Sequence, residues 1–199
     1  MRLMVAVFLL TAGCVADSGC ISTKPVHYYS LGAPAPPANR DKPDGLVLLI
    51  GGIAAPEALQ DNRIRYRAGS NEAGAYEYHR WTERPASMVR IALMGGLRES
   101  GKYQSVLESG NSVNGDYLLR GKLEEFDEVD QASIQTKISL HVELVNRKAN
   151  QNVWARTVER VEPVGGKSVA DVVQSLDRNL QHVVDEIAAD LDRFLSAPR

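Results

Sequence analysis

The sequence predicts an α+β domain in which a largely antiparallel sheet carries helices on one face, one of them a long C-terminal helix. Residues 134–144 alternate strictly between apolar and polar side chains, which is typical of a strand with one face on a core and the other in water. Residues 169–194 place apolar side chains three or four positions apart, the period of an amphipathic helix. Such a sheet face and such a helix bury each other in a two-layer domain.

The chain opens with a short apolar run, and its residues 10–14 read Leu-Thr-Ala-Gly-Cys. The run is too short to cross a bilayer, which requires about 20 residues. Small residues directly before a cysteine resemble the lipobox that the bacterial lipoprotein signal peptidase cleaves. We therefore interpret residues 1–13 as a signal peptide and Cys14 as the first mature residue, which would carry acyl chains such as palmitate and tether the protein to a membrane.

Two alternatives to this interpretation stay open. Cys20 is a competing lipidation site, and Thr11 stands where a lipobox usually has leucine. We favour Cys14 because Asp17, three residues before Cys20, is unfavourable in an apolar peptidase groove. The structural alternative is that residues 4–12 form a short buried strand or the start of a helix.

The composition argues against several kinds of partner and cofactor. The formal net charge is −2 and no basic cluster stands out, so neither nucleic acid nor a purely electrostatic membrane contact is expected. Both cysteines lie within the first 20 residues, which leaves the folded part without a thiol for a disulfide. The histidines lack metal-ligand spacing, so we expect no metal and no cofactor. They are His27, His79, His141 and His182.

Residues 14–44 are expected to form the acylated N-terminus and a spacer, and the folded domain is expected over residues 45–199. Proline fixes φ and removes a backbone donor, so the proline-rich second half of the spacer favours extended, weakly ordered chain. The domain should open with a strand over residues 46–50. This run is entirely apolar and bounded by two glycines, which is typical of a strand buried on both faces.

The next predicted strand, residues 63–67, alternates between arginine and apolar side chains. Arg63, Arg65 and Arg67 would share its exposed face and are candidates for binding a partner or an anionic headgroup. A basic stripe of this kind more often serves solubility and protects a sheet edge, and we keep that interpretation beside the first.

A further strand leads to Trp81 and places Tyr76 and Tyr78 on one face. Together these aromatic side chains form either an apolar ligand site or part of the core. Aromatic residues ahead of a helix are more often part of the core.

A helix should follow, with Thr82 as its cap, Pro85 in its first turn and Gly101 at its end. Gly95 and Gly96 interrupt its apolar face. Each lowers helix propensity by roughly 1 kcal/mol relative to alanine, so their presence indicates close packing against a neighbouring element.

The remainder of the chain alternates between predicted strands and turns before its last helix. Ser168 and Asp171 resemble a capping box, from which that helix should run to about Leu195. The strands before it should end in a long antiparallel hairpin. These strands are expected at residues 103–107, 116–126, 134–144 and 153–161.

No arrangement of residues typical of catalysis stands out, so we do not expect an enzyme. The sequence has no nucleophile elbow, phosphate-binding glycine loop or zinc-protease motif. The acidic run at residues 124–130 is the only candidate for calcium. Because it lacks the ligand spacing and central glycine of a calcium loop, we interpret it as a solvated strand end and turn.

Three motifs after the lipobox carry a family resemblance. In order they are Tyr28-Tyr29-x-Leu31, Pro56-x-x-Leu59 before the arginine strand, and Tyr78-x-x-Trp81-x-x-x-Pro85 leading into the helix. Their order and spacing resemble the ABC-type transport auxiliary lipoprotein family, which includes the lipoprotein of the paraquat-inducible Pqi system. The resemblance extends from Tyr28 to the last helix.

This resemblance implies a non-catalytic periplasmic lipoprotein that works with an MCE-domain protein and an ABC permease and ATPase. Its task would be lipid transport between the inner and outer membranes. Val15 replaces the aspartate that retains lipoproteins in the inner membrane of enteric bacteria, which favours the periplasmic face of the outer membrane. An exposed strand edge would bind the MCE assembly or a second copy of this protein, giving a homo-oligomer. A scaffold lipoprotein of envelope assembly and an envelope enzyme are the alternatives.

Overall fold

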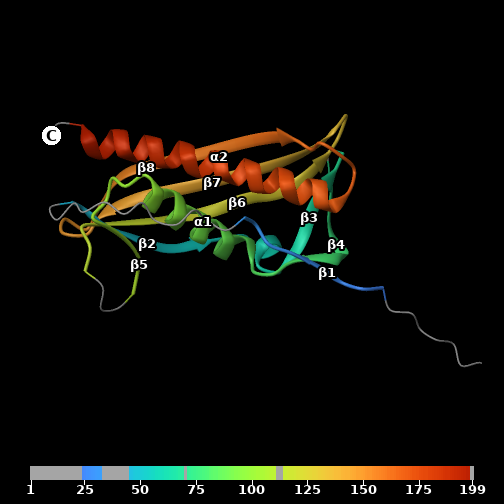
Figure 1. The fold of residues 1–199 in the computed structure, drawn as a ribbon, viewed down its shortest axis with the longest axis horizontal. Coiled ribbons are helices and arrows are strands. Elements are labelled where there is room, and N and C mark those ends of the chain that lie inside the picture. Colours follow the sequence, from blue (N-terminus) through green and yellow to red (C-terminus); the bar gives the residue numbers. More distant parts are fainter. Residues whose placement is uncertain (1–23, 33–44, 70, 111–113, 198–199) are drawn as a thin grey trace, which may run out of the picture.

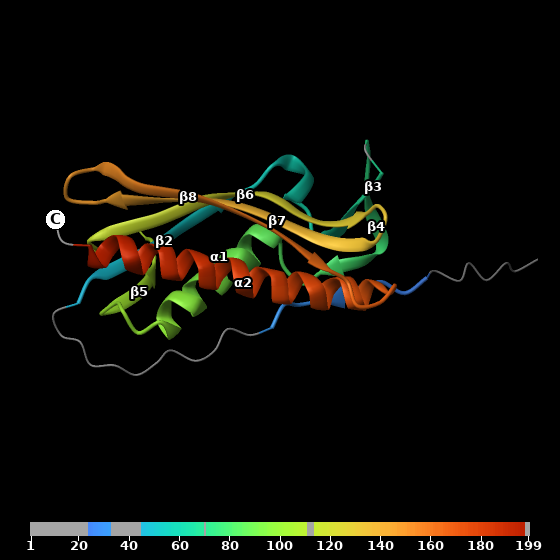
Figure 2. The same ribbon diagram turned by 90° about the horizontal axis from the view of Figure 1, so that it is seen from above.

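The computed structural model describes residues 24–32, 45–69, 71–110 and 114–197. They form two layers, an eight-stranded sheet and a pair of helices that lie on the same face of it (Figures 1 and 2). The predicted α+β class with a long C-terminal helix is therefore confirmed. The elements are β1 (His27–Tyr29), β2 (Val47–Ala54), η1 (Glu57–Leu59), β3 (Arg63–Ala68), β4 (Glu72–Trp81), α1 (Pro85–Glu99), β5 (Ser105–Glu108), β6 (Tyr117–Asp130), β7 (Ile134–Asn146), β8 (Gln151–Pro163) and α2 (Val169–Ser196).

Strand β6 lies at the centre of the sheet, because its 14 residues pair with three other strands. Along one edge β6 pairs antiparallel with β7, which pairs antiparallel with β8. Along the other edge the first half of β6 pairs parallel with β2 and the second half parallel with β3. β5 extends the β2 side, while β4 and then β1 extend the β3 side. The sheet is thus mixed, with antiparallel hairpins joined through parallel pairs.

The buried strand predicted at residues 46–50 is β2, whose Leu48, Leu49 and Ile50 are fully buried. The strand does not stop at its two glycines. It continues to Ala54, and the register with β6 shifts between Ile50 and Ile53. A bulge of this kind bends a strand, which explains how the glycine pair lies inside the element instead of ending it.

The core lies between the sheet and the helices. Alternate side chains of β7 point into it, from Ile138 to Leu144, and all of these are fully buried. Trp81 at the end of β4 meets Phe126 of β6 edge to face, with ring centroids 5.7 Å apart. This contact joins the β3–β4 part of the sheet to its centre, and it assigns Trp81 to the core.

Both helices begin near the predicted residues, but only one has the predicted cap. The Ser168 side chain accepts a hydrogen bond from the backbone N–H of Asp171, and the Asp171 carboxylate accepts one from the backbone N–H of Ser168. Helix α2 therefore has a complete capping box. In α1 the expectation for Thr82 is wrong. Arg84 holds the N-cap position without a side-chain hydrogen bond, and Pro85 starts the helix. The backbone N–H of Thr82 instead donates to the Tyr29 carbonyl.

Residues 27–32, which the sequence predicts to belong to the spacer, lie on the folded domain. β1 adds a parallel strand beside β4, with His27 opposite His79 and Tyr29 opposite Trp81. The proline-rich residues 34–43 therefore follow β1 in the chain and connect it to β2, and they do not separate the domain from Cys14. Cys14, Cys20 and the proposed signal peptide lie outside the described residues. Among the described residues, no helix is long and apolar enough to cross a membrane.

Candidate docking groove between the two helices

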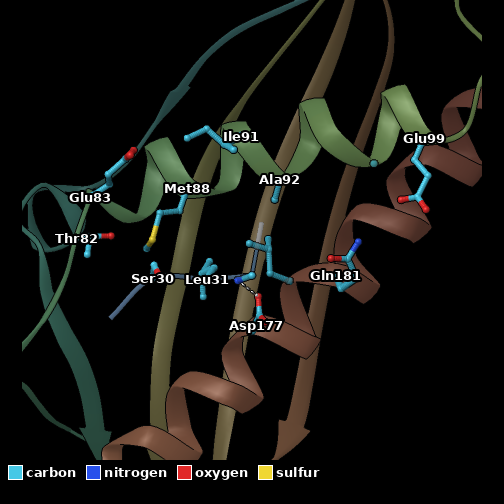
Figure 3. A pocket seen from close by; sticks show the side chains of 13 residues that line it. Ser30, Leu31, Thr82, Glu83, Met88, Ile91, Ala92, Glu99, Asp177 and Gln181 are labelled. Carbon is cyan, nitrogen blue, oxygen red and sulfur yellow. Dashed lines mark hydrogen bonds between the residues drawn. The ribbon is translucent and has the colours of Figure 1, made fainter. Parts of the chain in front are cut away.

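A groove runs between α1 and α2 on the helix layer (Figure 3). Met88, Ile91 and Ala92 line it from α1, and Leu180 lines it from α2. The amphipathic pattern of both helices explains this arrangement. Each helix packs its most apolar face on the sheet, and the apolar residues at the border of that face point toward the other helix. Ile91 is 37% exposed although it is a large aliphatic residue, so the groove presents apolar surface to the solvent.

Residues 30–32, here called the strap, cross the groove at one end. The backbone N–H of Gly32 donates to Asp177 Oδ1 of α2 at 3.0 Å, and Leu31 packs against the core beside Met88 (Figure 3). A Cβ at Gly32 would lie 3.1 Å from Asp177 Oδ2, so a residue without a side chain suits this approach. Together with the hydrogen bond from Thr82 to Tyr29, these contacts fasten the segment before residue 33 to both helices.

The two helices pack tightly against each other at Gly96. A Cβ added there would lie 2.3 Å from Cγ1 of the fully buried Val184. The sequence indication that this glycine marks close packing is therefore explained, and the neighbour is α2. The close contact holds α1 and α2 together along one stretch and leaves the groove open beside it.

Carboxylates surround the groove. Glu83 lies just before α1, Glu99 lies at its far end, and Asp177 projects from α2 (Figure 3). Lys and Arg are missing from the described residues that line the groove. Within the part of the chain that the structure describes, none of these three carboxylates forms an ion pair. The rim is therefore negative, and Glu83 and Glu99 are both exposed to solvent.

The volume of the groove limits what it can hold. It encloses about 170 Å³, and an apolar cavity of about 150 Å³ is large enough for benzene. Small-molecule sites usually measure about 300–1,000 Å³. The described part of the groove therefore has room for one large apolar side chain.

The three candidate arginines lie on β3, and each has an acidic partner. Arg63 pairs with Asp61 at 2.6 Å. Arg67 donates to Asp127 Oδ2 at 2.9 Å, and Arg65 lies 4.0 Å from Asp127 Oδ1. Arg65 and Arg67 occupy the sheet face opposite the helices, because Ile64, which directly precedes Arg65, is buried in the core and side chains alternate between the two faces of a strand.

The sequence predicts a solvated strand end and turn at residues 124–130, and this prediction is wrong. These residues form the second half of β6, where Asp127 and Glu128 are buried on opposite faces. Burial raises the pKa of both carboxyls, while the Arg67 guanidinium favours the charged form of Asp127. Glu128 accepts a hydrogen bond from the Tyr76 hydroxyl at 2.8 Å. Among the described residues no cluster of three metal-ligating side chains occurs.

The aromatic residues near β4 separate into different environments. Tyr76 is half-buried beside Glu128, and Lys24 lies over the ring of Tyr78 at 5.7 Å. His79 stacks on both His27 and Tyr29 of β1, and the Tyr29 hydroxyl lies 2.9 Å from its Nδ1. Burial, together with the nearby His27, lowers the pKa of His79. These contacts join β1 to the sheet.

The residues of the family motifs support structure near the groove. Tyr29 joins β1 to β4, Leu31 lines the groove, Trp81 fills the core and Pro85 is buried at the first position of α1. Pro56 precedes the short η1 turn, and Tyr28 is 61% exposed. No pattern in the sequence predicts the groove or its rim. Glu83, Glu99 and Asp177 carry no motif, and only the contact between distant helices brings them together.

Comparison with known proteins identifies a family and a fold. Residues 29–188 match the family model described as the ABC-type transport auxiliary lipoprotein component. Among curated proteins, no sequence matches this chain.

Solved structures share the architecture at low sequence identity. A DUF330-family protein from Xanthomonas campestris superposes with a TM-score of 0.75 at 19% identity, covering 85% of this chain and 96% of that one. A hypothetical protein from Chlamydia trachomatis gives a TM-score of 0.55 at 9% identity, covering 77% of this chain and 99% of that one. At these identities the likeness establishes the fold.

Proposed function

Because the chain belongs to the ABC-type transport auxiliary lipoprotein family, we propose that it is a membrane-tethered, non-catalytic adaptor of an MCE-type ABC transport system. Its partners are then an MCE-domain protein and an ABC permease and ATPase, and the transported material is lipid that moves between the inner and outer membranes. The family match over residues 29–188 is the observation that carries this proposal. The groove between α1 and α2 has room for one large side chain, which suits an adaptor that docks another protein.

The proposed anchor is Cys14, with Cys20 as the alternative. The described chain begins at Lys24, ten residues after Cys14. An extended chain rises at most about 3.3–3.6 Å per residue, so this tether keeps Lys24 within about 35 Å of the acylated sulfur. Because β1 follows almost at once and is fastened to β4, the anchor holds the β1–β4 edge of the sheet close to the bilayer.

The proposed location is the periplasmic face of the outer membrane, on the argument from Val15 given above. We further propose that β8 provides a contact between copies or with the MCE protein. Among the described strands β8, a strand of 13 residues, pairs with β7 alone, so its other edge has no strand partner there. Two of its carbonyls, those of Arg160 and Pro163, accept hydrogen bonds from the α2 side chains of Asn179 and Ser175. A partner strand can bind such an edge.

The anchor is tested by fractionating cells that express the full chain with Cys14→Ala or Cys20→Ala. Loss of membrane retention in Cys14→Ala, with retention kept in Cys20→Ala, supports Cys14. The opposite result assigns the anchor to Cys20, and retention in the double variant refutes acyl tethering.

The adaptor role is tested by affinity purification of the full chain from detergent-solubilised membranes. Recovery of an MCE-domain protein with its permease supports the proposal. Recovery of outer-membrane assembly proteins without any MCE protein contradicts it and favours a scaffold.

A further inference from the structure

We propose that the groove between α1 and α2 binds one apolar side chain from a partner protein segment that carries Lys or Arg on both sides of it. The inference rests on the proposed function, since the partner is a protein component of the transport assembly. It goes beyond that function by assigning the docking site and the chemistry of the docked segment.

The apolar part of this specificity comes from the floor of the groove. Met88, Ala92 and Leu180 provide a floor without a charged group, and Ile91 stays 37% exposed at its edge. A space of about 170 Å³ accepts a single side chain of the size of Leu, Met or Phe. Burial of such a side chain removes it and Ile91 from water together, which favours binding.

The basic part comes from the rim. Glu83 and Glu99 stand at opposite ends of α1, and Asp177 faces them from α2 (Figure 3). Many acidic groups elsewhere on the domain have cationic partners within the chain, for example Glu125 with Lys137 and Asp190 with Arg156. The rim carboxylates form no ion pair among the described residues, so their field is free to attract a cationic partner.

The negative charge of the rim favours a protein partner over an anionic membrane surface. The inner surface of a groove for anionic lipid headgroups would carry Lys or Arg, whereas a rim of three carboxylates repels such a surface. The 15 residues of α1 at 1.5 Å per residue span roughly 22 Å between the ends where Glu83 and Glu99 lie, which corresponds to about seven residues of extended chain. A short segment with a central apolar residue and basic residues toward its ends fits this spacing.

The decisive experiment places a photo-crosslinking amino acid at Ile91 of the full chain in its native membranes and sequences the crosslinked peptide by mass spectrometry. The expected product is a peptide of another protein in which an apolar residue lies between Lys or Arg residues. A lipid adduct, a peptide from a second copy, a peptide from residues 33–44 of the same chain, or the absence of a product would each overturn the inference. The same amino acid at Val161 on the opposite sheet face is the positional control and should not yield the expected peptide.

Charge reversal tests the rim separately. Glu83→Lys with Glu99→Lys should lower the yield of the Ile91 crosslink about tenfold. The matched control, Glu57→Lys with Glu72→Lys, reverses two exposed carboxylates away from the groove and should leave the yield unchanged. An equal crosslink yield in both variants would refute the proposed attraction between the rim carboxylates and basic residues of the partner. If the MCE protein co-purifies while the crosslink goes elsewhere, this inference fails and the proposed function stands.

Discussion

The close approach of α1 and α2 at Gly96 makes a quantitative prediction. In Gly96→Ala the new methyl carbon would lie 2.3 Å from Val184 Cγ1, far inside normal contact. Val184 is fully buried and β-branched, so it cannot rotate away and the helices must separate. Overpacking of this kind costs about 1–3 kcal/mol, and alanine returns roughly 1 kcal/mol of helix propensity. We expect the free energy of unfolding to fall by about 1 kcal/mol.

A double-mutant cycle separates the clash from other effects. Val184→Ala alone should cost about 2 kcal/mol, because it removes buried methyl groups and leaves a cavity. In the double variant the methyl group introduced by Gly96→Ala would occupy the space that Val184 vacates, so the two changes should cost about 1–2 kcal/mol less than the sum of the single ones.

Urea unfolding followed by circular dichroism measures all four proteins. The control is Gly52→Ala in β2, where an added Cβ meets no atom within 4 Å and stability should change by no more than about 0.5 kcal/mol. If the two helix substitutions are additive within about 0.5 kcal/mol, the helices do not meet at Gly96 and the description of the groove is wrong.

Three further predictions concern stability. Arg67→Met removes the guanidinium 2.9 Å from buried Asp127 and should cost about 1–3 kcal/mol at neutral pH. Burial raises the folded-state pKa of Asp127 above 3.8, so the charged carboxylate destabilises the fold increasingly as pH rises above that value. The stability lost in Arg67→Met should therefore shrink as pH falls toward 4, where Asp127 becomes neutral. A loss of stability that is independent of pH would contradict this. Because the pKa of His79 is lowered in the folded protein, the free energy of unfolding should decrease as pH falls through 6.5. His79→Phe should reduce the difference between the free energies of unfolding measured at about pH 7.5 and pH 5.5. Ser168→Ala should cost about 1 kcal/mol by removing the α2 cap, whereas Ser87→Ala in α1 should not; equal effects would argue against the cap.

Much of the architecture is predictable because it depends on local periodicity. The alternation at residues 134–144 and the spacing of residues 169–194 each identify an element and its buried face. The capping box at Ser168 fixes where α2 starts. The meaning of Gly96 is also predictable in part, since a glycine inside a helix indicates a close neighbour.

The pairing of strands and the site were not predictable in the same way. Alternation shows which face of β6 is buried, but it does not reveal that β2 and β3 share one of its edges. Asp127 appears solvated in sequence because its neighbours are acidic, and only the contact with β3 explains its burial. The groove needs three segments that lie far apart in the chain, namely the strap, α1 and α2.

If the proposed adaptor role is right, this protein couples an MCE-type transporter to a membrane without carrying lipid itself. The most direct measurement is quantitative mass spectrometry of the complex purified through the full chain from membranes, counting both proteins and lipids. We expect an MCE-domain protein with ABC permease and ATPase in fixed ratio, and lipid that disappears when the MCE protein is removed. Lipid that stays bound to this chain alone, or a complex without an MCE protein, would contradict it.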